Sequence, residues 1–536
     1  MNRPAHIVVI GGGLAGLAAA VELRGAGASV TLVEANRHLG GKMNVLEDRG
    51  FSFDMGPTIL TLQEVLSGII RRAGRRVADE IELVRLDPQW RCHYEDGVTL
   101  DLRDGAGSAA ALGDQLPGTD AAAGFGSLLE FSRRMNRLSR NVFFYRDVGG
   151  VVDVMRGTPL GDRQVLLDAL AMRLHSTLSR TIESHVQESH VRQMAEHFLQ
   201  YVGSSPFLGP SVLGMIASAQ TDQGCWYAMG GTRMVARALE RIARDQGVVV
   251  RLGTAVTSIR QQQGRVAGVT LDSGEAIDAD AVISNMDVQR TLRDLVGTAP
   301  ARRAQESIAR KYEPACSGIV LYLGLDRQYE HLAHHNFVFS ADSRAEFDDI
   351  YARGQPARDP TLYIAAPSRT DPAQAPAGSE ALYILVHTPY IRDGSIQGDR
   401  DRFIASYRPV IMQKLARFGM EDIEQHIVVE HALTPGGIER MYRAEGGAIY
   451  GLASHGRFRG GFKPRNTSSV LRGLYLAGGS VNPGPGTPMA LMSGVTAALC
   501  AARDLGLPHP DIAATSHEPA EGEFHWAQPQ PALATA

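Results

Sequence analysis

The fold of this chain is decided by the stretch His6-Ile7-Val8-Val9-Ile10-Gly11-Gly12-Gly13-Leu14-Ala15-Gly16. The β-branched run predicts a buried parallel strand, and Gly11-x-Gly13-x-x-Gly16 predicts a tight turn that opens a helix. Gly11 allows the turn, Gly13 lets a pyrophosphate approach the backbone, and Gly16 lets the helix pack close to the strand. Phosphates would then lie at the positive N-terminus of a helix, which indicates a dinucleotide ligand.

A second strand, predicted from Ser29 to Val33, ends in Glu34, about 20 residues beyond the glycines. A carboxylate at this place accepts hydrogen bonds from a ribose. The unmodified 2′-hydroxyl of FAD or NAD suits it, whereas a 2′-phosphate would be repelled. Three glycines alone would also fit an ordinary strand-to-helix turn, so the acid is what favours the dinucleotide.

The residues after Glu34 separate a flavin from a nicotinamide. Gly40-Gly41-Lys42 and Asp54-Met55-Gly56-Pro57-Thr58 resemble the extended FAD fingerprint of the amine oxidase and phytoene desaturase superfamily. In that fingerprint a Gly-Gly-basic turn follows the ribose-binding acid, and the basic residue helps to hold the cofactor. Lys42 replaces the commoner arginine, so the resemblance implies a point charge rather than a bidentate contact.

The composition indicates a large folded chain. It has 536 residues, of which 44% are hydrophobic, and a formal net charge of −4. That length predicts at least two domains, and the near-neutral charge excludes the concentrated basic surface of a nucleic-acid binder. The four scattered cysteines are expected to be reduced core thiols, and no signal peptide precedes the first strand, so we expect a cytoplasmic protein.

Two long segments without Asp, Glu, Lys or Arg, Phe198 to Thr221 and Gly473 to Ala502, could be mistaken for membrane spans. Proline and glycine interrupt both, so we predict no transmembrane helix but leave peripheral membrane contact open. The apolar stretch Tyr201 to Gly214 is either simple core or the wall of a lipophilic tunnel.

Between these segments the pattern changes from strands to helices. Alternation from Ile81 to Leu102 predicts strands outside the nucleotide core, and a helical pattern runs from Gly124 to about Gln200. Within it, Arg133, Arg137 and Arg140 share a helix face. This face is either solvated or laid on anionic lipid.

The chain then returns to the flavin domain. The turn Trp226 to Thr232 and the helix Met234 to Gln246 precede a strand at Val248 to Leu252, as in the same superfamily, where Val256 matches the valine that meets the adenine. A second strand-rich region follows from about Glu313 to Pro435. The paired His334 and His335 there do not have metal-ligand spacing, and we predict no metal.

The C-terminal part resembles a second cofactor loop. A strand within Gly473 to Gly479 runs into a glycine turn, and Asn482 to Met489 leads into a helix predicted from Ala490 to Leu505. Pro488 suits the first helical turn, because its missing N–H would be unpaired there. The helix start can aim N–H groups and a positive dipole at the flavin ring edge that becomes negative on reduction.

Four motifs together are similar to the bacterial-type phytoene desaturase and related carotenoid desaturase family over about residues 6–505. They are the leading Gly-Gly-Gly-Leu-Ala-Gly-Leu, Asp54-x-Gly56-Pro57-Thr58, the turn from Trp226 to Gly231, and the closing Gly-x-x-x-x-Pro-Gly-x-Gly-x-Pro-Met. The resemblance implies an α/β fold, with a Rossmann-like FAD-binding domain, an inserted mixed-sheet substrate domain and a helical, membrane-facing region. The expected segments are FAD-binding 1–75, 226–300 and 441–506; substrate and helical membrane-facing 76–225; substrate 301–440; and a disordered tail 507–536.

Members of this family oxidise a saturated C–C bond flanked by double bonds in a long isoprenoid, by hydride transfer to flavin N5 and loss of the vicinal proton. Phytoene is our first expectation for the substrate. A hydroxycarotenoid 3,4-desaturase, a C30 dehydrosqualene desaturase, an isomerase and a terminal-methyl oxygenase stay open. A flavin amine oxidase and a non-catalytic prenyl carrier are the more distant alternatives, because the closing loop has no aromatic residue and the flavin motifs are retained.

The resemblance also implies site residues and partners. Glu130 and Arg133 match a charged stretch near the flavin and the substrate entrance, and are either catalytic or an exposed helix pair. No second dinucleotide motif is present, so oxygen or a membrane quinone is the expected electron acceptor, with the protein on the inner face of the membrane. The predicted FAD-binding residues are Gly11, Gly13, Leu14, Ala15, Gly16, Glu34, Gly41, Lys42, Gly56, Pro57, Thr58, Val256, Gly478, Gly479, Pro488 and Met489.

Overall fold

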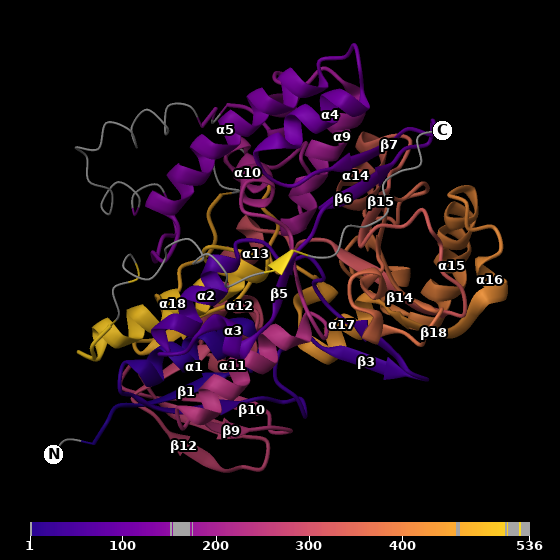
Figure 1. Ribbon diagram of the computed structural model, residues 1–536. Coiled ribbons are helices and arrows are strands. Elements are labelled where there is room, and N and C mark those ends of the chain that lie inside the picture. The colour runs from indigo at the N-terminus through magenta and orange to yellow at the C-terminus, as the bar shows by residue number, and fades with distance from the viewer. Residues whose placement is uncertain are drawn as a thin grey trace.

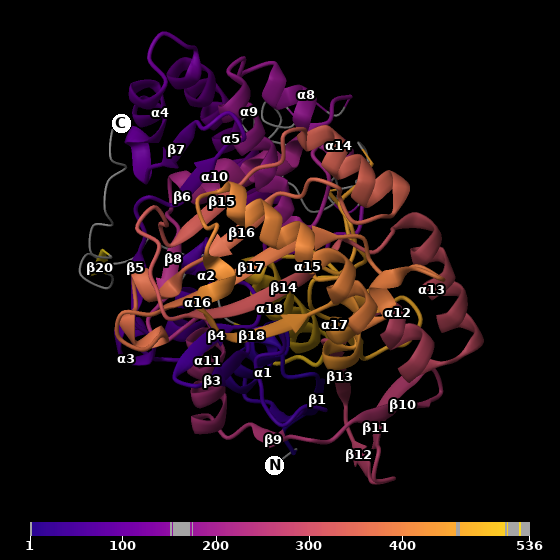
Figure 2. The ribbon, with the colours of Figure 1, turned by 90° about the vertical axis from the view of Figure 1, so that its right-hand side faces the viewer.

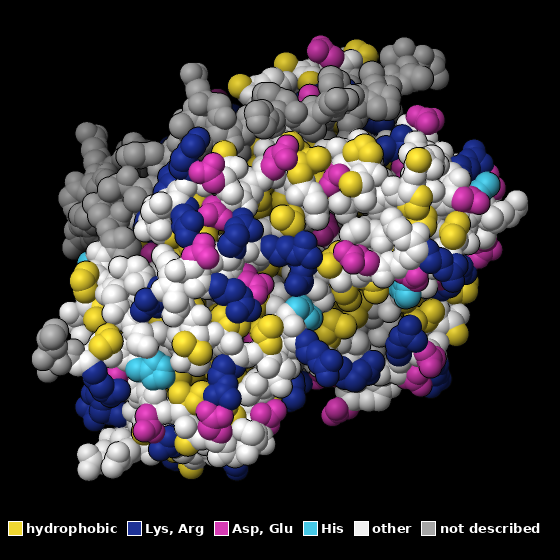
Figure 3. All heavy atoms as spheres, turned by 60° about the horizontal axis from the view of Figure 1, so that its bottom comes forward, with side chains coloured by type: hydrophobic (Ala, Val, Ile, Leu, Met, Phe, Trp, Pro, Cys, Tyr) yellow, Lys and Arg dark blue, Asp and Glu magenta, His cyan; other side chains and the backbone are white. Residues whose placement is uncertain are grey.

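The computed structural model describes residues 3–150, 153, 172–173, 175–456, 461–509, 512 and 525–526 (Figure 1). A parallel sheet lies near the N-terminus, a larger mixed sheet lies beside it, and a group of helices covers one end (Figure 1). On the face shown in Figure 3, basic and acidic side chains are interspersed, as a near-neutral net charge predicts. All four cysteines are buried and unpaired, which confirms the predicted core thiols.

The parallel sheet is built from distant parts of the chain. Its order is β19-β13-β1-β2-β9, and every neighbouring pair is parallel. The strands are β1 (His6–Ile10), β2 (Ser29–Val33), β9 (Val249–Arg251), β13 (Ala281–Ser284) and β19 (Leu474–Leu476). The strands β1, β2, β9 and β19 match predicted strands. All strands except β9, whose Val249 is 56% exposed, are nearly completely buried, which explains their continuous apolar runs.

Two helices lie in close contact beside this sheet. They are α1 (Leu14–Gly25) and α18 (Thr487–Asp504), and α11 (Arg233–Asp245) also packs on α1. A side chain at Gly494 of α18 would place its Cβ 2.1 Å from the carbonyl oxygen of Ala15. The first turn of α1 therefore contacts α18 about two turns after its start, at a place where only glycine fits.

The mixed sheet has seven strands in the order β18-β14-β17-β16-β15-β6-β7. Pairing is antiparallel except between β15 and β6. Two strands come from the segment 76–225 and five from 301–440, so the two predicted substrate segments share one sheet. The strands are β6 (Trp90–His93), β7 (Thr99–Leu102), β14 (Ser317–Leu325), β15 (His335–Val338), β16 (Leu362–Ala365), β17 (Glu380–Thr388) and β18 (Ile427–Leu433).

Both faces of this sheet are covered. On β14, Ile319 and Leu321 pack with Phe403 of α15 (Arg400–Arg417), which lies over the sheet in Figure 2. Val320 and Tyr322, pointing the other way, belong to the core shared with α1 and α18. The alternate residues of one strand thus serve an outer core and an inner face.

The helical group at the top of Figure 1 confirms the predicted helical pattern for the described part of residues 124–200; residues 151–152, 154–171 and 174 of that range lie outside the described residues. Arg133 pairs with Asp222 through two 2.8 Å hydrogen bonds, and Arg140 contacts Glu64 at 2.6 Å, so both of these arginines are paired within the fold. Its helices are α4 (Ser108–Gln115), α5 (Ala121–Val142), α8 (Leu178–Glu183), α9 (Ser189–His197) and α10 (Met215–Thr221). Within the described ranges, no helix combines the length and the apolarity needed to cross a bilayer.

Shorter strands and helices connect the parallel sheet, the mixed sheet and the helical group. Strand β8 (Trp226–Ala228) pairs with β5 (Leu83–Arg85) rather than joining the parallel sheet. The predicted disordered tail lies mostly outside the described residues; its described strand β20 (His525–Trp526) pairs with β5. The remaining strands are β3 (Val45–Asp48), β4 (Phe51–Asp54), β10 (Val256–Gln262), β11 (Arg265–Leu271) and β12 (Ala276–Asp278). The remaining α-helices are α2 (Gln63–Arg72), α3 (Val77–Glu80), α12 (Val288–Arg290), α13 (Ala299–Lys311), α14 (Ser343–Phe347), α16 (Ile423–His426) and α17 (Pro435–Tyr442).

Candidate active site

A cavity of about 860 Å³ joins the carboxyl ends of the parallel strands to the inner face of the mixed sheet. Ligands of open parallel sheets bind at that strand edge. The cavity wall contains every predicted cofactor-binding residue except Gly16. Gly16 has the packing role that its spacing predicts, because a Cβ there would lie 2.0 Å from the carbonyl oxygen of Gly11.

The glycine loop leaves the start of α1 open to the cavity. Gly11 has a φ of +89°, which favours glycine, and Gly13 is the N-cap of α1 without a side-chain cap. A Cβ at Gly13 would lie 2.8 Å from the side-chain amide of Asn285, which also lines the cavity. In the amide orientation that satisfies its neighbours, the Asn285 side-chain oxygen accepts hydrogen bonds from the N–H groups of Gly13 and Gly16, both at 3.2 Å. The other N–H groups of the first turn need an acceptor, and a pyrophosphate supplies one.

Glu34 is positioned for a ribose. Its side chain is 6% exposed, and its carboxylate accepts hydrogen bonds from the backbone N–H groups of Gly12 and Asn36, both at 2.7 Å. These bonds fix the carboxylate at the wall and leave it further acceptor capacity. Val256, predicted to meet the adenine, lines the same end of the cavity.

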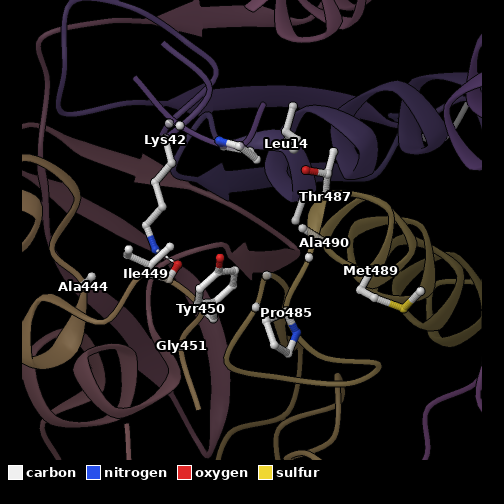
Figure 4. Close-up of a pocket in the computed structure, with 18 of the residues that line it drawn as sticks. Leu14, Lys42, Ala444, Ile449, Tyr450, Gly451, Pro485, Thr487, Met489 and Ala490 are labelled. Atoms are coloured by element: carbon white, nitrogen blue, oxygen red, sulfur yellow. Dashed lines mark hydrogen bonds between the residues drawn. The ribbon is translucent and has the colours of Figure 1, made fainter. Parts of the chain in front are cut away.

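Lys42 is partly buried, and its amino group donates to the carbonyl oxygens of Ala448 and Ile449 (Figure 4). Burial lowers the pKa of Lys42 to about 8, while the nearby Asp287 raises it. Lys42 therefore links the Gly-Gly-basic turn to the segment that carries Tyr450. Gly56 packs directly against the backbone of Lys42, because a Cβ there would lie 2.0 Å from the carbonyl oxygen of Lys42.

A second uncapped helix start reaches the cavity from α18. Its N-cap, Gly486, has no side chain, and Pro488 lies in the first turn as predicted. The hydroxyl oxygen of Thr487 is buried and has no hydrogen-bond partner among the described residues. In Figure 4, Leu14 lies close to Thr487 and Ala490, so the starts of α1 and α18 meet at one side of the pocket. The two N-termini and the Glu34 carboxylate fit the phosphate, ribose and ring edge of a flavin dinucleotide.

The other wall is an apolar row across the mixed sheet. Register places its members opposite one another on successive strands, and Trp90 of β6 continues the row, with ring centroids 4.6 Å from Phe337. Six strands spaced by about 4.8 Å give a row of about 24 Å. The paired members are Leu433, Val320, Leu385, Tyr363 and Phe337, and all of them line the cavity.

A buried hydrogen-bond chain joins the two walls. The Thr58 hydroxyl contacts the Tyr363 hydroxyl, which lies 2.9 Å from Nδ1 of His335. Nδ1 of His334 contacts the Thr370 hydroxyl at 2.7 Å. Among the described residues, no group of three His, Cys, Asp or Glu side chains could hold a metal ion.

Glu130 and Arg133 lie on α5 and do not line the cavity. Glu130 is exposed, and the Arg133 guanidinium forms a bidentate pair with Asp222. The structure therefore does not bring this pair to the other site residues. Its catalytic role stays a prediction, and no step below uses it.

Sequence reasoning missed one cofactor-side residue and most of the apolar row. Asn285 directly follows the buried strand β13, and its place at a carboxyl strand end was a signal that could have identified it. The residues of the apolar row come from strands far apart in the sequence. No local pattern in the sequence predicts the register that brings them side by side.

Comparisons with known proteins agree with this geometry. Residues 14–501 match the family model described as flavin containing amine oxidoreductase. The chain is 37% identical over 495 residues to a 4,4′-diapolycopene oxygenase of Methylomonas sp, covering 92% of this chain and 97% of that protein. It is also 37% identical over 489 residues to a 4,4′-diaponeurosporene oxygenase of Staphylococcus aureus, covering 91% and 96%.

Solved structures share the fold at low sequence identity. An oxidoreductase from Methanosarcina mazei superposes with a TM-score of 0.62 at 19% identity, covering 92% of this chain and 99% of that one. Cyclohexylamine oxidase from Brevibacterium oxydans superposes with a TM-score of 0.59 at 16% identity, covering 94% and 100%.

Proposed function

The chain belongs to the flavin-containing amine oxidoreductase family, and we propose that it uses FAD to oxidise the terminal carbon of a long acyclic carotenoid. The predicted FAD-dependent oxidoreductase is confirmed by the family match. The observation that carries the finer proposal is the near full-length similarity to two enzymes named as a 4,4′-diapolycopene oxygenase and a 4,4′-diaponeurosporene oxygenase. Terminal-methyl oxygenation was one of the alternatives that the sequence left open; phytoene stays a prediction.

The cavity supports a long apolar substrate. Its sheet wall offers aliphatic and aromatic side chains over about 24 Å, which suits a rigid polyene lying across the strands. Burial of such a chain is favoured by roughly 25 cal/mol for each Å² of apolar surface removed from water. Because apolar burial does not depend on direction, the wall stabilises the bound polyene but does little to fix its orientation.

The chain's own residues hold and orient the cofactor. When bound, FAD supplies the hydride acceptor. Glu34 would hold the ribose, and the start of α1 would bind the pyrophosphate. The start of α18 would stabilise negative charge at the edge of the flavin ring. Lys42 fixes the segment that ends in Tyr450, and so keeps the wall beside the ring in place.

We extend the proposal to partners and location. In the balanced reaction, one dioxygen molecule converts the terminal methyl group to an aldehyde: one oxygen atom enters the product, and the other leaves as water with two of the hydrogen atoms of that carbon. For a terminal alcohol, the hydride taken up by the flavin passes on to dioxygen or to a membrane quinone, and the product is the aldehyde. The substrate dissolves only in a bilayer, so the protein would collect it as a peripheral protein on the inner face of the membrane.

The test uses the FAD-loaded protein with vesicles that contain 4,4′-diaponeurosporene in air, and chromatography with mass spectrometry of the extracted pigments. The expected product carries oxygen on a terminal carbon. If phytoene is converted to coloured products that contain no oxygen atom, the protein is a desaturase. If an amine is oxidised with release of peroxide, it is an amine oxidase. Gly13→Val is the negative control and should form no product. Its side chain would meet the Asn285 amide and block the pyrophosphate of FAD.

A further inference from the structure

Three polar side chains interrupt the apolar wall of the cavity. His197 is the last residue of α9, Gln200 lies in the short 3-10 helix Phe198–Val202 that follows it, and His387 lies on β17. Their exposed fractions are only 7%, 4% and 7%. Buried polar groups normally have hydrogen-bond partners, so each of them needs an explanation.

Gln200 lacks such a partner. Its side-chain oxygen is buried without a hydrogen bond to any residue that the structure describes. The neighbouring Trp90 and Tyr201 differ, because the Trp90 N–H donates to the Tyr201 hydroxyl at 3.2 Å and that hydroxyl donates to Gln220. Within the described chain, Gln220 and Gln89 nearby also have an unpaired amide atom, but neither lines the cavity, whereas Gln200 does.

The His197 ring is surrounded by aromatic side chains. Its centroid lies 4.7 Å from that of Phe337, 5.3 Å from that of Phe339 and 6.2 Å from that of Trp90. Within the described part of the chain, no hydrogen bond to its ring nitrogens is found. His387 has one long contact, 3.4 Å from its Nε2 to the Tyr450 hydroxyl. Both rings keep unused hydrogen-bonding capacity toward the cavity.

These groups are neutral. Burial lowers the pKa of His197 to about 3 and that of His387 to about 4, and the two rings are close enough for His387 to contribute to the shift of His197. A neutral imidazole offers one donor and one acceptor, and an amide offers both. A neutral hydroxyl or aldehyde matches them, whereas a carboxylate would lose its hydration without gaining an opposite charge from these side chains.

The position of these groups is next to the flavin side of the cavity. A Cβ at Gly486, the N-cap of α18, would lie 3.7 Å from the carbonyl oxygen of Tyr201. A Cβ at Gly203 would lie 2.3 Å from the ring of Tyr450, which Figure 4 shows between Ile449 and Pro485. The segment that carries His197 and Gln200 therefore contacts both the loop before α18 and the segment that Lys42 holds.

We propose that His197, Gln200 and His387 bind the oxygen of a hydroxyl or aldehyde group on the end of the polyene. The proposal rests on the proposed function and names its substrate class more closely. A chain end that already carries oxygen satisfies the three groups, while a hydrocarbon end leaves them desolvated and unpaired. The enzyme then prefers the terminal alcohol over the hydrocarbon by about 10- to 100-fold in kcat/KM. A reaction that places the first oxygen on this carbon, here or on another enzyme, must supply the preferred substrate.

The test compares a 4,4′-diapocarotenoid hydrocarbon with its terminal alcohol in vesicles, using the FAD-loaded protein. In Gln200→Met and His197→Phe, the ratio of kcat/KM for alcohol over hydrocarbon is expected to fall about tenfold or more. Gln193→Met is the matched control, because Gln193 lies on α9, as His197 does, but donates to the carbonyl oxygen of Ser340 outside the cavity. An unchanged ratio in both site variants, at wild-type FAD content, overturns the proposal.

A binding measurement separates this inference from the proposed function. Dissociation constants for alcohol and hydrocarbon are read from the change in flavin absorbance, without turnover. If neither compound is oxidised but the alcohol binds more tightly and Gln200→Met removes the difference, the proposed function fails and the oxygen site stands. If both are oxidised and bind equally well to the wild-type protein, the oxygen site fails and the proposed function stands.

Discussion

Replacing Gly494 by alanine tests whether the contact between α1 and α18 sets the cofactor site. The new Cβ would lie 2.1 Å from the carbonyl oxygen of Ala15 and 2.9 Å from its Cα. Both neighbours are backbone atoms of a helix, so they cannot turn aside as a side chain would. Restoring an ordinary contact requires a local separation of the helices by about 1.3 Å.

The substitution is expected to lower both the free energy of unfolding and the affinity for FAD. Overpacking of a well-packed core costs about 1–3 kcal/mol in the free energy of unfolding. The same displacement moves the first turns of α1 and α18, which both line the cavity, away from each other. We therefore expect FAD affinity to fall by at least about tenfold, equivalent to about 1.4 kcal/mol.

Flavin fluorescence quenching measures the affinity, and thermal unfolding of the FAD-loaded protein measures the stability. The control is Gly25→Ala at the exposed end of α1, where a Cβ meets no atom within 4 Å. That variant should be neutral or more stable by up to about 1 kcal/mol. Wild-type FAD affinity and unfolding temperature in Gly494→Ala would refute the reasoning.

Three further predictions concern single side chains. Glu34→Ala removes the ribose acceptor and leaves the Gly12 N–H unpaired, so FAD affinity measured by calorimetry should fall about 10- to 100-fold; wild-type affinity would contradict the assignment. Burial raises the pKa of Asp54 to about 6, above its unfolded value of about 3.9, so its contribution to the free energy of unfolding is largest at low pH and is lost as the pH rises from about 4 to 6. Urea unfolding should show this slope in the wild-type protein but not in Asp54→Asn, and equal slopes would count against it. Arg133→Gln breaks a partly exposed pair, so turnover should stay within about twofold of wild type; a large loss of kcat would restore the catalytic prediction for Arg133.

Local patterns predicted the nucleotide side of the molecule well. Apart from the partly exposed edge strand β9, the strands of the parallel sheet are short buried runs whose residues alone indicate a strand, and Gly11, Gly16 and Glu34 occupy positions dictated by backbone geometry. The substrate side could not be predicted in this way. Tyr363 faces Phe337 and Leu385 only because three separate strands adopt one register, and register is set by packing across the whole sheet.

The same limit explains the charged residues. Arg133 has a helical spacing that fits a lipid-facing row, but its partner Asp222 lies 89 residues away and becomes a neighbour only when α10 packs on α5. Lys42 matched the family motif in sequence, while its contacts with Ala448 and Ile449 depend on a segment more than 400 positions later. Motifs predict which residues matter, and long-range packing decides what they touch.

The scattered origin of the parallel sheet has a consequence for the newly made protein. Its central strand leaves the ribosome first, but the neighbour β13 begins at Ala281, and β19 and α18 come from the last part of the described chain. Until α18 is synthesised, Ala15 on α1 lacks the helix that packs against it. The cofactor site then also lacks the second of its two helix starts. The nascent chain must therefore be protected from aggregation at least until α18 has been synthesised, and FAD can contact both helix starts only after that point.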